Sequence, residues 1–475
     1  MVMKKGDILE GLRVESMAAE GKCVARLDGK VVFIEGAAPG DVVEARITKI
    51  KNNFLEATLS RVITPSANRV EPVCSHFGFC GGCRWQHLNY ETQLQYKQQQ
   101  VVDSLERIGG LTFPTVQPII PSSKTTYYRN RLDFSATNYR WLTSPPNPRP
   151  SGEGELGRDG LGFHVAKSFD RVFDVEHCYL QPEPSNEIRK TIKEAAIGNG
   201  IPFFDLRKQT GYLRTVTIRT ATTGEVMVIV QVAYDKPEWL SVLMNEVSNR
   251  FPQTTSLLYV INTKRNDTFH ELTVNTWKGN PYITETMKRP EGSGVLQFRI
   301  GPKSFYQTNS EQAEKLYYVA WQLAALTGNE LVYDLYTGTG TIANYVAGEA
   351  KKVIGLEYVA AAIDDAKINS KLNSIANTDF FSGDIKNLLN EDFLNIHGKP
   401  DVVITDPPRA GMHEDVCKML LKAEPKRIVY VSCNPATQAR DLKIMADKYS
   451  IVAVQPVDMF PHTMHVENVV SLVKN

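Results

Sequence analysis

The stretch that decides the fold reads LVYDLYTGTGT and spans residues 331–341. It begins as a short apolar strand at 331–335 and ends in a glycine-rich turn, and a helix-compatible stretch follows from Ile342. Gly338 and Gly340 allow the backbone to turn sharply and to come close to a ligand. This order of strand, turn and helix predicts the first unit of an open parallel sheet that binds a ligand at its edge.

Strands and helices alternate in the same way from about residue 300 to the end of the chain. We predict short apolar strands at 353–357, 401–405 and 427–432, each followed by a helix-compatible stretch. Such alternation is typical of a doubly wound parallel sheet. We therefore expect a Rossmann-like domain over residues 296–475 of a multidomain α/β protein.

Two acids suggest which ligand this sheet binds. The second predicted strand ends in Glu357, 19 residues beyond Gly338 (357 − 338), where a carboxylate can accept hydrogen bonds from both hydroxyls of a ribose. Asp384 follows a third strand and is suited to bind the edge of an adenine. Dinucleotide enzymes also have glycine-rich turns, but the third glycine of their G-x-G-x-x-G pattern is missing here. The pattern therefore favours S-adenosylmethionine over NAD.

Reactive side chains follow two further strands. Asp406-Pro407-Pro408-Arg409 comes after the strand at 401–405, and Ser432-Cys433-Asn434-Pro435 after the strand at 427–432. Methyltransferases that modify amines have an aromatic residue where Arg409 stands, so amine chemistry is disfavoured. A cysteine after an apolar strand is either a small buried residue or a nucleophile. Its place at the same sheet edge as Asp406 favours the nucleophile.

A thiolate at this edge suits one reaction in particular. Carbon 5 of uracil is too weakly nucleophilic to attack a sulfonium methyl, but addition of a thiolate at carbon 6 turns the ring into an enolate that can. A base must then remove the proton from carbon 5. Glu467, just before a predicted strand at 469–473, is the candidate base, and a solvated carboxylate at a strand start is the alternative reading.

The first half of the chain is less regular. Closely spaced strands with turns such as Asp28-Gly29 predict a small, OB-like antiparallel β-barrel over residues 1–64, either a solubilising appendage or an RNA-binding module. Residues 65–295 read as a mixed α+β domain with a predicted helix at 91–107. Its Pro- and Gly-rich segment 144–162 is predicted to be a loop.

The chain has seven cysteines, an odd number that argues against a disulfide framework. Three are closely spaced and a fourth follows much later, and together they suit one metal centre: Cys74, Cys80, Cys83 and Cys178. Zinc favours paired Cys-x-x-Cys units and only one pair is present, although His76 and His87 keep a zinc site open. Radical adenosylmethionine enzymes also bind a cluster with a three-cysteine loop, but their cysteines have a different spacing, so this class is disfavoured.

Composition excludes some classes of protein. With 42% hydrophobic and 23% charged residues and a net charge of +1, the 475-residue chain is globular, has no apolar run that suits a signal peptide or a membrane span, and is expected to be cytoplasmic. The run Tyr127-Tyr128-Arg129-Asn130-Arg131 joins aromatic to basic side chains. It suits either a looped-out RNA strand or one solvated face of a strand.

Four motifs together give the chain a family resemblance. They are Phe305-Tyr306-Gln307-Thr308-Asn309, the segments around Asp406 and Cys433 quoted above, and Asp458-Met459-Phe460-Pro461-His462-Thr463. The chain resembles the RNA uracil-5-methyltransferases over nearly its whole length, and it is most similar to the members that modify 23S ribosomal RNA. That resemblance implies a TRAM barrel at the N-terminus, a 4Fe–4S cluster on the four cysteines, and a helix at 91–107 that packs on the catalytic domain.

The resemblance also implies roles for single residues. Cys433 is expected to be the nucleophile and Glu467 the proton-abstracting base. The cofactor and uracil pocket is expected to be lined by Gln307, Tyr336, Thr341, Glu357, Asp384 and Asp406. The turn departs from many relatives, which carry Cys-Gly where this chain has Thr337-Gly338. We expect a monomer that acts on RNA. Transfer RNA as substrate and a catalytically silent RNA-binding protein are the alternatives.

Overall fold

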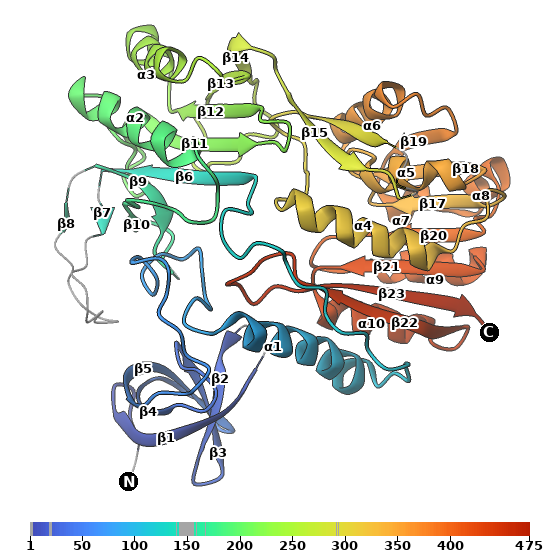
Figure 1. Ribbon diagram of the computed structural model, residues 1–475, viewed down its shortest axis with the longest axis horizontal. Coiled ribbons are helices and arrows are strands. Elements are labelled where there is room, and N and C mark those ends of the chain that lie inside the picture. The colour runs from blue at the N-terminus through green and yellow to red at the C-terminus, as the bar shows by residue number, and fades with distance from the viewer. Residues whose placement is uncertain are drawn as a thin grey trace.

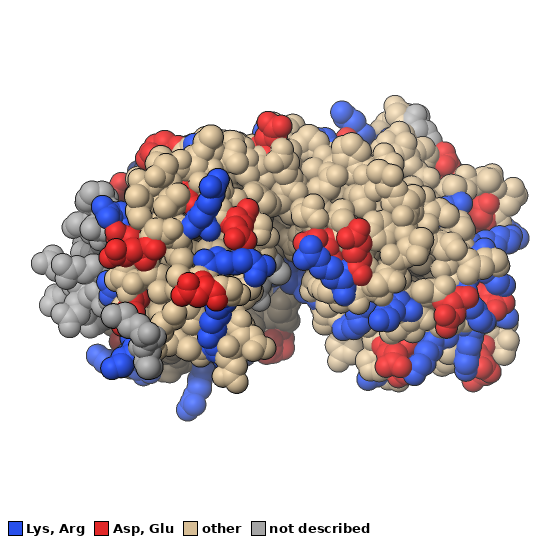
Figure 2. Space-filling view, turned by 90° about the horizontal axis from the view of Figure 1, so that it is seen from below, with Lys and Arg blue, Asp and Glu red and all other residues tan. Residues whose placement is uncertain are grey.

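The computed structural model of this protein describes residues 3–18, 21–138, 140–141, 156–157, 159–166, 168–290, 292 and 294–475. Figure 1 shows a small barrel near the N-terminus, a central sheet with two helices beside it, and a further sheet flanked by helices at the C-terminal end. On the face seen from below, the Lys and Arg side chains of the described residues are interspersed with Asp and Glu and form no single basic patch (Figure 2).

The N-terminal strands close into a barrel, in the order β1-β2-β3-β5-β4. The strands are β1 (Ile8–Met17), β2 (Cys23–Leu27), β3 (Lys30–Glu35), β4 (Val42–Ile50) and β5 (Phe54–Thr64). Asp28 and Gly29 both have positive φ (48° and 79°), as a tight two-residue hairpin between β2 and β3 requires. Alternate side chains such as Val32 and Ile34 fill the interior. The predicted barrel is confirmed, but it is not wholly antiparallel, because β3 and β5 pair in parallel.

The central part is built on a nine-stranded sheet in the order β14-β13-β12-β11-β6-β9-β10-β7-β8. The elements are β6 (Arg131–Thr137), β7 (Arg140–Trp141), β8 (Leu156–Gly157), β9 (Gly160–His164), β10 (Val172–Phe173), α2 (Ser185–Gly198), β11 (Leu213–Thr220), β12 (Val226–Val232), α3 (Pro237–Arg250), β13 (Ser256–Ile261) and β14 (Asn275–Gly279). The predicted loop at 144–162 is wrong at its end, because residues 156–157 and 160–162 pair as strands. Residues 142–155 and 158 lie outside the described residues.

The C-terminal part is the predicted Rossmann-like sheet, in the order β19-β18-β17-β20-β21-β23-β22. Its elements, after the hairpin β15 (Ile283–Lys288) and β16 (Val295–Ile300), are α4 (Ser310–Ala324), β17 (Leu331–Leu335), α5 (Thr341–Val346), η3 (Ala347–Glu349), β18 (Lys352–Glu357), α6 (Ala360–Leu372), β19 (Thr378–Ser382), α7 (Ile385–Leu388), α8 (Glu391–His397), β20 (Val402–Thr405), α9 (Glu414–Ala423), β21 (Arg427–Ser432), α10 (Pro435–Met445), β22 (Tyr449–Val457) and β23 (Glu467–Lys474).

Two apolar layers cover this sheet, because alternate residues of each strand point to opposite faces. Val332 belongs to the layer that contains α4, whereas Tyr333 belongs to the other layer. The first five strands are parallel, and β23 is antiparallel to both β21 and β22. The carboxyl ends of the parallel strands therefore meet the amino end of β23 at one edge of the sheet.

An early segment completes the second layer. Helix α1 (Tyr90–Asp103) starts at the Asn89 cap, whose side chain accepts a hydrogen bond from the Thr92 N–H, and continues as a π-helical segment, η2 (Ser104–Gly109). Val101 and Leu105 join the apolar cluster on the catalytic sheet, and α1 runs beside that sheet in Figure 1. The expected packing of this helix on the C-terminal part is observed. None of the helices among the described residues is both long and apolar enough to cross a bilayer.

Candidate active site

The residues singled out in the sequence follow neighbouring strands at one edge of the sheet. Tyr336 follows β17, Glu357 ends β18, Asp384 lies just beyond β19, Asp406 follows β20 and Cys433 follows β21. All five strands are parallel, so these positions lie along the same rim. This edge is where open α/β sheets bind their ligands.

Strand register brings Cys433 and Glu467 together. Antiparallel β23 pairs with β21 so that Ser432 lies opposite Asn468. The next position in this register puts Cys433, which follows Ser432, beside Glu467, which precedes Asn468. The two groups interact electrostatically, since the Glu467 carboxylate contributes to raising the pKa of the Cys433 thiol. A contact across 34 residues of sequence (467 − 433) is thus fixed by backbone pairing.

The acids of this rim are held in a largely water-free setting. Burial, and then the nearby Asp406 carboxylate, raise the pKa of Glu467 to about 8, and its side chain is only 4% exposed. Burial likewise raises the pKa of Asp406 to about 7. Since one negative charge disfavours a second one close by, the two carboxyl groups share a proton over the neutral range. Such a pair can accept a proton near neutral pH.

The thiol itself is not activated in the free protein. Burial, and then Glu467 and Asp406, raise the pKa of Cys433 to about 11, while a hydrogen bond from Arg409 opposes this rise. The carbonyl oxygen of Arg409 accepts hydrogen bonds from Asn434 Nδ2 (3.0 Å) and Thr437 Oγ1 (3.2 Å). These bonds fix the Asp-Pro-Pro-Arg loop against the start of α10, next to the thiol.

The glycine-rich turn is shaped for close approach. Tyr336, Gly338 and Gly340 all have positive φ (64°, 56° and 75°). A Cβ atom at Gly340 would meet the Ala366 Cβ at 2.9 Å, whereas one at Gly338 would meet nothing within 4 Å. The turn therefore packs tightly on α6 and has an open side at Gly338. The Gly338 N–H donates to Glu357 Oε2 at 3.1 Å, which ties the turn to the acid at the end of β18.

A buried acid under the turn holds its backbone. Asp334 Oδ2 accepts hydrogen bonds from Thr337 Oγ1 (2.5 Å) and the Ala343 N–H (3.0 Å), and burial raises the pKa of Asp334 to about 7. Thr341 is almost enclosed and lies 3.3 Å from the Thr339 hydroxyl. Asp384 caps α7 by accepting from the Lys386 N–H. These groups shape a cradle for a ligand on the open side of the turn.

Tyr317 lies next to this rim and was not predicted from the sequence as a site residue. Tyr317 of α4 is 5% exposed, accepts or donates a hydrogen bond with Gln307, and lies in the field of Asp406, Asp334 and Glu467. It belongs to the buried stripe of α4, so helical periodicity predicts only that it is a core residue. The aromatic rings of Phe305 and Tyr358 are instead 66% and 72% exposed beside Gln307 and Glu357. Large exposed rings next to a ligand site suit stacking.

The segment between β22 and β23 is anchored by early residues. Lys97 Nζ donates to Asp458 Oδ1 (2.6 Å) and to the carbonyl of Phe460 (2.9 Å), and both members of this ion pair are fully buried. The Tyr128 hydroxyl donates to the Pro461 carbonyl at 2.9 Å. Tyr128 is 7% exposed, so its role in the Tyr127–Arg131 run is structural and it offers no face for stacking on RNA. These bonds hold the segment that leads into Glu467.

The four metal-candidate cysteines converge on one place between the barrel and the central sheet. Burial raises the pKa of the Cys80 thiol to about 12, and electrostatic repulsion from three nearby thiols adds to this rise. These are the thiols of Cys83, Cys178 and Cys74. The Gly82 N–H donates to the Cys80 sulfur at 3.4 Å. Among the described residues no group of three or more Cys, His, Asp or Glu is close enough to hold a single metal ion. Within the described residues, the structure therefore does not show the metal centre that the four cysteines were expected to form.

Together, the sheet order, the cradle at the glycine-rich turn and the acids along the rim define a Rossmann-like S-adenosylmethionine-dependent methyltransferase. Comparison with known proteins agrees. Residues 277–475 match the family model "tRNA (Uracil-5-)-methyltransferase", and residues 11–60 match the TRAM domain. A protein of Bacteroides thetaiotaomicron is 51% identical over 96% of this chain and 99% of its own, and one of Porphyromonas gingivalis is 53% identical over 98% and 100%. Both are named uncharacterized RNA methyltransferases.

A solved structure is similar over the whole length. The Pyrococcus abyssi tRNA (uracil-54, C5)-methyltransferase in complex with S-adenosyl-L-homocysteine superposes with a TM-score of 0.73 and 28% identity, and the match covers 98% of this chain and 100% of that one. The chain belongs to the RNA uracil-5-methyltransferase family. It is an S-adenosylmethionine-dependent RNA methyltransferase with an N-terminal TRAM domain.

Proposed function

We propose that this enzyme methylates carbon 5 of a uridine in 23S ribosomal RNA through a covalent bond between the Cys433 sulfur and carbon 6 of the base. One observation carries this proposal: the register of β21 and β23 sets a cysteine beside an acid whose pKa is raised to about 8, at the rim where the sheet binds its ligand. A nucleophile paired with a base is what the reaction at carbon 5 needs.

In this reaction Arg409, Cys433 and Glu467 each have a distinct role. Arg409 hydrogen-bonds the Cys433 sulfur and favours its thiolate after the thiol proton leaves to solvent. The thiolate adds to carbon 6, and the electron pair of the ring double bond moves onto the O4 enolate. S-adenosylmethionine, when bound, would supply an electrophilic methyl group. As O4 becomes a carbonyl again, the enolate electron pair bonds carbon 5 to this methyl, and the pair of the broken S–CH3 bond stays on the cofactor sulfur. Glu467 then removes the carbon 5 proton, the C–H electron pair restores the ring double bond, and the sulfur leaves with the pair of the S–C bond.

The pocket residues have the roles that their positions suit. Glu357 would bind the ribose hydroxyls, Asp384 the adenine edge, and Tyr336 and Thr341 the remaining surface of the cofactor. Gln307 and Asp406 would contact the uracil, with Tyr317 holding Gln307. The base must leave its stack to reach Cys433, so we expect it to be flipped out of the RNA.

The reaction is tested by following the proton at carbon 5. Substrate RNA is transcribed with uridine tritiated at carbon 5 and incubated with the enzyme and S-adenosylmethionine. The proposal predicts one tritium released to water for each methyl group incorporated. Methyl incorporation without release of tritium would show that another atom of the RNA is modified.

Transfer RNA is the second candidate substrate. It is favoured by the similarity to the Pyrococcus abyssi enzyme, which is named for a uridine of tRNA. The match to that enzyme covers 98% of this chain, so it includes residues of the barrel and of the cysteine region. Those two features therefore do not separate the two substrates. Purified 23S RNA and tRNA from a strain that lacks the gene are the direct test. The proposal predicts 5-methyluridine in 23S RNA only, and methylation of tRNA alone would select the alternative.

We also propose that Cys74, Cys80, Cys83 and Cys178 hold a 4Fe–4S cluster with a structural role. The mutual influence of the four thiols supports this assignment, as does the Gly82 N–H that points to the Cys80 sulfur. Protein purified without oxygen should contain about four iron atoms per chain, with the brown absorbance of such clusters. Stoichiometric zinc would overturn the assignment. We place the enzyme, as a monomer, in the cytoplasm, and size-exclusion chromatography tests the monomer.

A further inference from the structure

A cavity of about 470 Å³ lies away from the catalytic rim, where the TRAM barrel meets the cysteine loop, which we define as residues 74–88. Its volume is within the range of roughly 300–1,000 Å³ of small-molecule sites. The lining residues come from the barrel, from the linker that follows it and from the cysteine loop: Gly36, Leu59, Arg69, Val70, Glu71, Pro72, Phe77 and His87. None of them belongs to the methyltransferase sheet.

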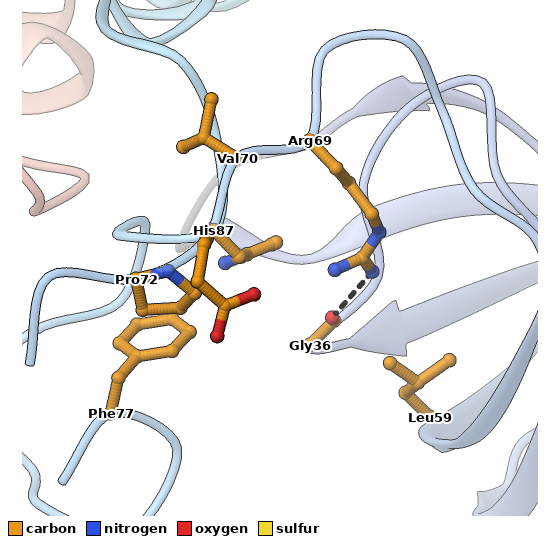
Figure 3. Close-up of a pocket in the computed structure, with 8 residues that line it drawn as sticks. Gly36, Leu59, Arg69, Val70, Pro72, Phe77 and His87 are labelled. Atoms are coloured by element: carbon orange, nitrogen blue, oxygen red, sulfur yellow. Dashed lines mark hydrogen bonds between the residues drawn. The ribbon is translucent and has the colours of Figure 1, made fainter. Parts of the chain in front are cut away.

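The walls of this cavity suit a flat aromatic ligand. Figure 3 shows Phe77 and Pro72 on one side and Arg69, Gly36 and Leu59 on the other. The Phe77 ring packs on the ring of His87, with 5.3 Å between centroids, and His87 is fixed by a 3.1 Å hydrogen bond to the carbonyl of Ala37. Unpaired bases are commonly bound between aromatic side chains and Arg guanidinium planes.

Arg69 is held in place and keeps one donor free. Its Nε and Nη2 make bonds of 2.7–3.0 Å to the fully buried carboxylate of Asp41, and Nη2 also donates to the carbonyl of Gly36 at 3.3 Å. Nη1 has no hydrogen-bond partner among the described residues. A guanidinium fixed in this way loses little freedom when it binds a further acceptor.

Glu71 supplies the complementary group. Its carboxylate lines the cavity and takes part in no hydrogen bond or ion pair among the described residues, including none with Arg69. The cavity therefore offers one unused donor and one unused carboxylate to the same occupant. Guanine matches this pair: N1–H and the N2 amine form two parallel donors for a carboxylate, and O6 and N7 accept from an arginine.

We propose that this cavity is a second RNA subsite that binds an unpaired guanine of the substrate. The proposal rests on the proposed function to the extent that the ligand is part of the RNA. The cysteine loop connects the two sites, because the N–H groups of Arg84 and Trp85 both donate to the carbonyl of His462 (2.8 and 3.0 Å), in the segment that leads to Glu467. One RNA that fills the cavity would thus rest on the loop that supports the catalytic segment.

The test uses the full-length chain and 8-azidoguanosine 5′-monophosphate, with crosslinked peptides mapped by mass spectrometry. The proposal predicts crosslinks in residues 59–77, and competition by GMP about tenfold stronger than by IMP, AMP or CMP, since IMP lacks the N2 amine. Glu71→Gln, which keeps the shape of an exposed side chain, should remove this preference. Glu106→Gln, which changes another exposed carboxylate, on η2, should keep it.

Three results would overturn the subsite: crosslinks that map elsewhere, competition by CMP or AMP as strong as by GMP, or an unchanged preference in Glu71→Gln. The same preparations are assayed for tritium release from RNA. Release without guanine binding would refute the subsite and leave the proposed reaction intact. Guanine binding without release would refute the reaction and keep the subsite.

Discussion

The catalytic rim and the cysteine loop were both visible in the sequence, but they are built differently. Cys433 and Glu467 are set side by side by the pairing of two buried strands. The cysteine loop contains no long strand or helix, and isolated bridges such as Cys80 to Val165 anchor it. Burial raises the pKa of Cys80, in this loop, and of Cys178, outside it, to about 12, so both thiols are neutral in the free protein. In the proposed cluster, iron would have to displace these protons, whereas the pairing of β21 and β23 forms the rim without a ligand.

The largest effect should come from removing the nucleophile. Cys433→Ala should lower methylation by a factor on the order of 10⁴ or more, because no other group can add to carbon 6. Cys23→Ala is the matched control: that thiol is fully buried on β2 of the barrel, outside the methyltransferase sheet. The control should keep full turnover. Substantial methylation by Cys433→Ala would break the proposed difference between the two regions.

Glu467→Gln should lower turnover by about 10²–10⁴-fold and let a covalent RNA–protein complex accumulate, since a glutamine cannot take the carbon 5 proton. In the wild type, turnover should rise with pH through about 8, as the carboxyl loses its proton. Ordinary turnover in this variant would remove Glu467 from its role.

Although Glu467→Gln should lower turnover, it should make the folded protein more stable. The folded-state pKa of Glu467 is raised from 4.5 to about 8, so its contribution to stability is present below pH 4.5 and is lost as the pH rises through 8. Glu467→Gln should therefore raise the melting temperature at pH 8 and change it little at pH 5. Thermal unfolding at both pH values measures this, and a lower melting temperature at pH 8 would contradict the burial argument.

Breaking the buried ion pair between Lys97 and Asp458, which anchors the segment before Glu467, should have a smaller effect. Lys97→Met leaves the Asp458 carboxylate buried without its cation, which costs about 3–5 kcal/mol of unfolding free energy. The double variant Lys97→Met, Asp458→Asn should recover much of this loss, because the charge is removed as well. Denaturant unfolding of the three proteins tests the prediction. Equal stability of the single and double variants would mean that the pair is not coupled.

The smallest effect on chemistry should come from the cysteine loop. Cys74→Ser should abolish iron binding yet change the rate of methyl transfer by only about threefold or less at saturating RNA, because the register of β21 and β23 does not depend on it. Iron content and single-turnover rates are measured on the same preparation. Loss of methyl transfer equal to that of Cys433→Ala would show that the rim is not independent.

The sequence predicted the sheet well and long-range contacts poorly. The strands at 331–335 and 427–432 were predicted to the residue, since each is an apolar run that ends at a change of composition. The roles of Lys97 and Tyr317 were missed. Lys97 meets Asp458 across 361 residues, and Tyr317 looks like an ordinary core residue of a helix. Strand β9 was missed because its glycines read as a loop.

We propose above all that the Cys433 sulfur bonds to carbon 6 of the flipped uracil, and that Glu467 lies beside carbon 5 and removes its proton. RNA with 5-fluorouridine at the target has no proton there to remove, so the enzyme and S-adenosylmethionine should stall as a covalent complex. Proteolysis and mass spectrometry of that complex should find the methylated nucleotide on the peptide that contains Cys433. No covalent complex, or an adduct on any other residue, would contradict the account.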